Sequence, residues 1–196
     1  MKVTLKKTIN NEAWKNLNDK IERKVSMQVG WFPQAKYFDK GETSIYHGKK
    51  HTETAYVAQV AMINEFGGKA IEGSYVPPRP FMRPAAKDNK GAWATQFSKD
   101  IKTLPTQYAL DRLGFKVEGD IRKAITNVWD PPLHPITVYN RLKKQGAFQK
   151  KTKEDTHNAI MKHLLQVVGT RSGIAKPLID TGYMIASITH RVGGKG

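Results

Sequence analysis

The sequence contains no cysteine among its 196 residues, which excludes disulfides, thiolate metal sites and a cysteine nucleophile. The N-terminal segment is too polar for a signal peptide, and no stretch approaches the roughly 20 apolar residues that a membrane span needs. Glycine-rich phosphate loops and the Gly-x-Ser-x-Gly nucleophile turn are also missing. We therefore expect a protein made in the cytoplasm, with no membrane contact, no cofactor and no catalytic residues.

Acidic residues are scarce relative to basic ones. The chain has 33 Lys and Arg against 17 Asp and Glu, a formal net charge of +16. Such a charge attracts polyanions, so double-stranded DNA and acidic protein surfaces are both candidate partners. The basic runs, such as Lys6–Lys7, Lys49–Lys50 and Lys150–Lys151, lie far apart in the sequence, and solvated basic faces are the simpler interpretation.

Apolar periodicity predicts a series of short elements in the first third of the chain. Residues 14–21 have helical spacing, and residues 25–31 alternate as a half-buried strand does. The polar segment 34–52 contains two glycines and is expected to be a mobile hairpin or loop. A second helix is predicted from an N-cap at Thr54 to a stop at Gly67.

The middle of the chain combines a proline-rich connector with the longest apolar stripe. We expect residues 76–84 to be extended because each proline disfavours helix in its predecessor, and we expect Phe81 to anchor the connector in the core. From Trp93 to Val128 the stripe indicates a long helix that Pro105 breaks or kinks. Gly114 and Gly119 weaken this helix by about 1 kcal/mol each.

The last third is predicted to hold a short helix capped by Thr137, a further helix within residues 147–174, a turn at 180–182 and a loose tail at 193–196. The class is α+β, in a single domain over residues 1–196. We expect a small, mostly antiparallel sheet packed against a long, kinked helix, with additional short helices.

Two patterns suggest chemistry that the rest of the chain does not support. The sequence Asp180-Thr181-Gly182 matches the catalytic turn of aspartic proteases, but only 14 residues remain after it, too few for the barrel that a retroviral-type subunit builds downstream. His47 and His51 have metal-ligand spacing but lie in a segment without a helical stripe, and Glu154 forms one Glu-x-x-His pair where a di-metal bundle needs two. We expect no metal site.

Three segments in a fixed order resemble the head–tail joining, or tail completion, proteins of long-tailed bacteriophages, which are related to the minor tail protein Z of lambda-type phages. They frame roughly residues 54–192. The residues that carry the resemblance are Glu65-Phe66-Gly67 at a helix exit, Arg79-Pro80-Phe81-Met82-Arg83-Pro84 before a long helix, and Thr137 and Arg141 followed by Pro177 and Asp180-Thr181-Gly182. Segments 34–52 and 147–174 depart from the pattern, and the second is interpreted as an inserted helical segment.

The resemblance implies a non-enzymatic structural protein of the virion neck. Such a protein forms a ring of its own copies, six in the family, between a head-side connector or stopper protein and the tail terminator or tail tube, and DNA passes through it. Two alternatives remain, namely a tail terminator that caps the tail tube and a basic nucleic-acid-binding protein. A binding module is distinguished by an affinity for DNA that falls steeply with salt.

Overall fold

The computed structural model describes residues 25–41, 54–69, 75–144 and 175–194, together with Glu12 and Lys15. Several predictions fall outside the described residues. They concern most of the helix at 14–21, the loop residues 42–52, the histidines and glutamate considered as metal ligands, and the segment at 147–174. In the described part of the chain, no helix has the length and apolarity required to cross a membrane.

The described elements are helices and small antiparallel sheets, which confirms the α+β class. In chain order they are β1 (Val25–Gly30), β2 (Lys36–Phe38), β3 (Ala55–Tyr56), α2 (Val57–Phe66), β4 (Gly68–Lys69), β5 (Tyr75–Val76), α3 (Met82–Thr103), α4 (Thr106–Asn127), α5 (Pro135–Lys144), α7 (Tyr183–Ala186) and β6 (Thr189–Gly194). The strands pair as β1 with β6, β2 with β3 and β4 with β5.

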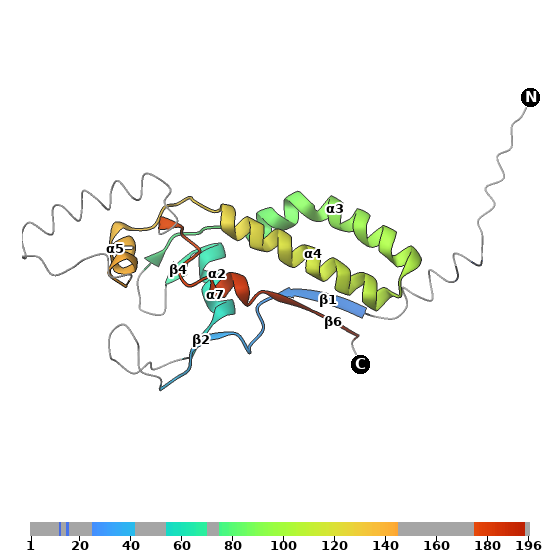
Figure 1. Ribbon diagram of the computed structural model, residues 1–196, viewed down its shortest axis with the longest axis horizontal. Coiled ribbons are helices and arrows are strands. Elements are labelled where there is room, and N and C mark those ends of the chain that lie inside the picture. Colours follow the sequence, from blue (N-terminus) through green and yellow to red (C-terminus); the bar gives the residue numbers. More distant parts are fainter. Residues whose placement is uncertain are drawn as a thin grey trace, which may run out of the picture.

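The two long helices form an antiparallel hairpin (Figure 1). The break expected at Pro105 is confirmed, but the single kinked helix is not, because the chain reverses direction between α3 and α4. Asp100 holds this corner: its carbonyl oxygen accepts the amide of Leu104 at 2.8 Å, and its buried carboxylate lies 3.2 Å from Nη1 of Arg112. A proline shows that a helix is interrupted without specifying the angle.

The fold has three layers, with α4 between α3 and the β1–β6 ribbon (Figure 1). Six residues of α4 are buried, against three of the equally long α3. In the ribbon Val25 pairs with Gly194 and Gly30 with Thr189, so the strand predicted at 25–31 is confirmed for β1. The main core contains Val57, Ala61, Phe81, Ala85, Val117, Ile121, Ile125, Leu178, Met184 and Ile188.

Several predicted boundaries are wrong. Thr54 caps no helix, since α2 begins at Val57 and the hydroxyl of Thr54 accepts the amide of Lys40 at 3.1 Å. Thr137 lies inside α5, which begins at Pro135. The predicted connector ends earlier than expected, because Met82, Arg83 and Pro84 already belong to α3. Proline is tolerated in a first helical turn, where its missing amide hydrogen has no intrahelical partner to lose.

Two segments predicted to be mobile or loose contain strands. Residues 36–38, at the start of the predicted hairpin or loop, pair antiparallel with β3, which is compatible with the hairpin. The tail residues Gly193 and Gly194 pair with Ser26 and Val25 in the ribbon, whereas Lys195 and Gly196 lie outside the described residues. For Gly193 and Gly194, pairing with β1, more than 160 positions away in the sequence, overrides the local preference of glycine for irregular structure.

Phe81 occupies the centre of the core, as predicted. Its side chain is 1% exposed and meets the ring of Trp31 edge-on, with centroids 5.8 Å apart. Trp31 is itself fixed, because its indole nitrogen donates to the carbonyl oxygen of Met184 at 2.7 Å. Phe81 therefore connects the start of α3 with β1 and with the segment around α7.

We predict that Phe81→Ala lowers the free energy of unfolding by about 3–5 kcal/mol, because it leaves a cavity in a packed core. The matched control is Phe66→Ala, since Phe66 is 61% exposed and stacks only beneath the guanidinium of Arg83. Its expected cost is about 1 kcal/mol or less. Urea denaturation of the two variants measures the difference, and equal losses would show that Phe81 is not a core anchor.

Candidate functional site

Glu65 links the end of α2 to the start of α3. Its side chain is buried, and Oε2 accepts the backbone amides of Phe81 at 2.7 Å and Met82 at 2.9 Å. The other oxygen, Oε1, accepts the amide of Arg83 at 3.1 Å and its Nε at 2.9 Å. A glutamate distant in sequence thus caps α3, whose own N-cap residue makes no side-chain hydrogen bond.

The surroundings of Glu65 favour its charged form. Burial alone opposes ionisation, but the amides of Phe81, Met82 and Arg83 and the guanidinium of Arg83 outweigh it and hold the pKa of Glu65 below its ordinary value. The positive end of the α3 dipole acts in the same direction. This carboxylate is fully engaged within the chain, so its role is to fix the connector rather than to exchange protons.

Arg79 attaches the connector to the loop after α4. It is 4% exposed, and it donates from Nε to the carbonyl oxygen of Pro131 at 2.7 Å and from Nη2 to that of Pro132 at 2.9 Å. Burial, together with the nearby charge of Arg141, lowers the pKa of Arg79 from its usual value. A planar guanidinium suits this arrangement because it can donate to two carbonyl groups at once.

Arg141 of α5 binds backbone carbonyl groups of the loop that precedes α7. Its Nη1 donates to the carbonyl oxygens of Lys176 at 2.7 Å and Ile179 at 2.8 Å, and its Nε lies 3.3 Å from Oδ1 of Asp180. Burial lowers the pKa of Arg141, although the carboxylate of Asp180 acts in the opposite direction. Pro177, part of the third segment of the resemblance, lies within this loop.

The turn Asp180-Thr181-Gly182 leads into α7. Gly182 has a φ of 75°, in the left-handed region that favours glycine, and the hydroxyl of Thr181 accepts a hydrogen bond from the amide of Tyr183 at 3.3 Å. Asp180 does not cap α7, since its carboxylate pairs with Arg141. The pKa of the neighbouring Tyr37 is raised to about 12, mainly by burial of the phenol and in addition by the negative charge of Asp180.

A second polar network joins α4 to β6. His190 is 5% exposed, with Nδ1 2.6 Å from Oε1 of Glu118 and Nε2 2.9 Å from Oδ1 of Asp111. Glu118 is buried and also pairs with Nη2 of Arg122 at 2.8 Å. Burial opposes charge on the imidazole, but the two carboxylates outweigh it and raise the pKa of His190 above 6.5. The imidazolium form donates to both carboxylates.

Gly114 leaves space for this histidine. A Cβ at position 114 would overlap the imidazole ring of His190, whereas Gly119, five residues later in α4, has no such atom within 4 Å of its would-be Cβ. Gly114 is therefore required by a close approach of β6. From the sequence alone, Gly114 was expected only to weaken the helix. The contact that requires a glycine here is with His190, 76 residues later in the chain.

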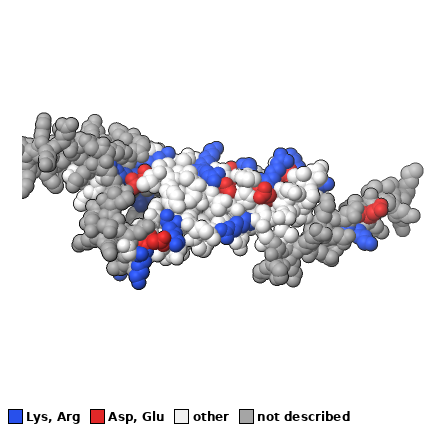
Figure 2. Space-filling view, turned by 60° about the horizontal axis from the view of Figure 1, so that its bottom comes forward, with Lys and Arg blue, Asp and Glu red and all other residues white. Residues whose placement is uncertain are grey.

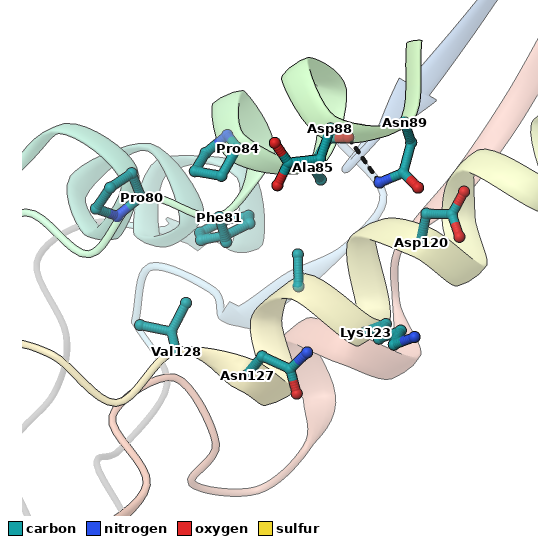
Figure 3. Close-up of a pocket in the computed structure, with 11 residues that line it drawn as sticks. Pro80, Phe81, Pro84, Ala85, Asp88, Asn89, Asp120, Lys123, Asn127 and Val128 are labelled. Atoms are coloured by element: carbon teal, nitrogen blue, oxygen red, sulfur yellow. Dashed lines mark hydrogen bonds between the residues drawn. The ribbon is translucent and has the colours of Figure 1, made fainter. Parts of the chain in front are cut away.

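A shallow cleft lies between the start of α3 and the end of α4 (Figure 3). Its volume is about 360 Å³, and it is lined by apolar residues that include Phe81, Ala85 and Val128 and by the polar residues Asp88, Asn89, Lys123 and Asn127. Asp120 also lines it, but that carboxylate already accepts Nε1 of Trp93 at 2.7 Å and Nζ of Lys116 at 2.8 Å. Among the described residues, no cluster of His, Asp and Glu could hold a metal ion.

The residues that carry the resemblance are distributed over three linked contacts rather than one pocket. Glu65, Phe81 and Arg83 meet at the α3 cap, Pro80 and Pro84 line the cleft, and Pro177 and Asp180 lie against Arg141. Gly67 ends α2 with a φ of 76°, Phe66 is exposed, and Thr137 takes part in none of these contacts through its side chain. Sequence reasoning missed the network of His190, Glu118 and Asp111, for which no local pattern exists.

No family profile matches the chain, and neither the curated proteins nor the solved structures include one that is significantly similar to it.

We predict opposite effects of the same substitution at two positions of α4. Gly114→Ala is expected to lower the free energy of unfolding by about 1–3 kcal/mol, because His190 must move from its two carboxylates. Gly119→Ala is expected to raise it by about 0.5–1 kcal/mol, since alanine is the better helix former and meets no neighbour. Thermal or urea unfolding of both variants provides the measurement, and a stabilised Gly114→Ala would contradict the packing of β6 on α4.

Proposed function

We propose that this protein is a structural component of a bacteriophage neck, where copies of it form a ring that joins the DNA-filled head to the tail. The order and spacing of the three segments between Glu65 and Gly182 support this proposal. So does the use of their polar side chains, because Glu65, Arg79 and Arg141 all hold one stretch of chain against another. The function of such a protein is contact with its neighbours, not chemistry.

The single observation that carries the proposal is a pair of exposed apolar surfaces on different elements. Met62 and Phe66 are 58% and 61% exposed and lie one turn apart on α2. Tyr108 and Phe115 are 67% and 63% exposed and lie two turns apart on one face of α4. Neighbouring exposed apolar side chains can combine into a patch, and contiguous apolar patches are typical of protein–protein contact surfaces, whereas apolar side chains exposed singly are ordinary.

The positions of these two surfaces suit a ring. The α2 surface lies beside the start of α3, whereas Tyr108 lies in the first turn of α4, next to the corner at the other end of the hairpin (Figure 1). In a closed ring each copy presents two different surfaces, one to each neighbour. Dimers with twofold symmetry need only one surface that binds itself. Two unlike apolar surfaces therefore favour a ring, and six copies follow from the resemblance.

The proposal predicts that the purified full-length protein forms a closed oligomer, which we expect to contain six copies. Native mass spectrometry gives the copy number, and negative-stain electron microscopy shows whether the particle is a ring. Tyr108→Asp and Phe115→Asp together should dissociate it, because they place charge in an apolar contact. Thr95→Asp, on the exposed side of α3, is the matched control and should leave the oligomer intact.

A protein that stays monomeric at its highest soluble concentration would contradict the ring. An oligomer that survives the double substitution in α4 would show instead that this surface is not an interface. Circular dichroism of the same variants separates loss of assembly from loss of folding.

A further inference from the structure

The outer side of α3 carries a row of lysines. Lys87, Lys90, Lys99 and Lys102 are all exposed, and the row from Lys87 to Lys102 extends over about 22 Å at the usual helical rise. At 100° per residue, Lys87, Lys90 and Lys102 fall within about a third of the helix circumference. The residues between them on this side, Gly91, Ala94 and Ser98, are small and exposed.

None of these four lysines has an ion pair within the described residues. In contrast, Lys36, Arg112, Lys116, Arg122 and Arg141 each have a carboxylate within 4.0 Å. In the view of Figure 2, Lys and Arg side chains are spread over the surface and several lie beside Asp or Glu. The α3 helix contains only two acidic residues, of which Asp100 is buried against Arg112 and Asp88 is exposed beside Lys87. Four exposed lysines against one exposed aspartate leave the outer side of α3 positively charged.

The layer order leaves this side of α3 open. The helix packs on α4, and its buried residues are Ala85, Asp100 and Ile101, whereas the side chains of the four lysines are exposed. Its large aromatics are not available to a partner from outside, since Trp93 and Phe97 are half-buried and Trp93 donates to Asp120. Every exposed large apolar side chain of the described residues lies on another element.

We propose that the α3 surface defined by Lys87, Lys90, Lys99 and Lys102 binds the phosphate backbone of double-stranded DNA without reading its sequence. The proposal deepens the proposed function and rests on it, because a neck ring encloses the path of the genome. The lysines neutralise phosphates, and the small residues between them let the backbone approach the helix closely. Such contacts supply nonspecific affinity and depend strongly on salt.

Double-stranded DNA fits this surface better than its two competitors do. Protein partners are bound through aromatic or aliphatic anchors at the centre of a contact, and this side of α3 has none. Single-stranded nucleic acid is bound through aromatic side chains on which its bases stack, and none is exposed here. A cationic row without apolar groups matches a partner whose outer surface is a regular array of phosphates.

The test compares two variants of the full-length protein that lose the same charge. The first replaces Lys87, Lys90, Lys99 and Lys102 by Gln. The second replaces four exposed cations on other elements by Gln, namely Lys40, Lys69, Lys123 and Arg191. Fluorescence anisotropy with a labelled DNA duplex of mixed sequence measures the affinity over a series of salt concentrations, and polyglutamate serves as a competing acidic polypeptide.

The expected result is a loss of affinity of more than about tenfold for the α3 variant only. In the wild type the slope of log affinity against log salt should be steeper than in this variant by up to about 3.6, at about 0.9 for each phosphate contact. Three results would overturn the proposal: no binding of the duplex by the wild type, equal losses in both variants, or displacement of the duplex by polyglutamate at equal charge concentration.

Measuring the oligomeric state of the same samples distinguishes failure of the DNA-binding proposal from failure of the proposed ring. A ring that forms normally but binds no DNA would contradict the α3 surface alone. A monomer that loses its DNA affinity only in the α3 variant would contradict the ring and leave the α3 surface in place.

Discussion

The carboxylate of Glu65 is the contact on which the arrangement of the long helices depends. It accepts hydrogen bonds from three consecutive backbone amides at the start of α3, and it is 3% exposed, so truncation of this side chain would remove the acceptor of all three amides. The same contact positions Phe81 in the core and sets the point from which α3 leaves the connector. Since α4 packs along α3, and the β1–β6 ribbon packs on α4, the placement of both further layers follows from this cap.

Apolar periodicity was sufficient to predict the elements that bury one regular stripe. Val117, Ile121 and Ala124 of α4 and the alternation in β1 are examples, and Gly182 shows the backbone conformation that its turn required. Contacts between distant positions could not be predicted in this way. His190 and Asp111 are 79 residues apart, and neither lies in a pattern that points to the other. Pro84 was misread because proline is tolerated in a first helical turn. Pro105 was correctly predicted to interrupt the helix, but a proline does not specify the angle between the two parts, which here is a full reversal.

The described surface divides into regions with different physical character. Exposed apolar side chains on α2 and α4 suit contacts between copies, whereas the lysines of α3 suit a polyanion. The buried polar side chains, including Glu65, Arg79 and Arg141, are satisfied within the chain. This division agrees with the proposed ring, in which each copy holds its neighbours on two sides and faces DNA on a third.

Electron microscopy of virions whose genome encodes this chain tests the proposed ring most directly. We expect a ring of this protein at the junction of head and tail, with α3 facing the bore and the α2 and α4 surfaces between adjacent copies. Particles that lack the gene should accumulate as DNA-filled heads and finished tails that do not join. A virion that contains no copy of the chain at this junction, or a gene deletion that leaves joined and infectious particles, would contradict it.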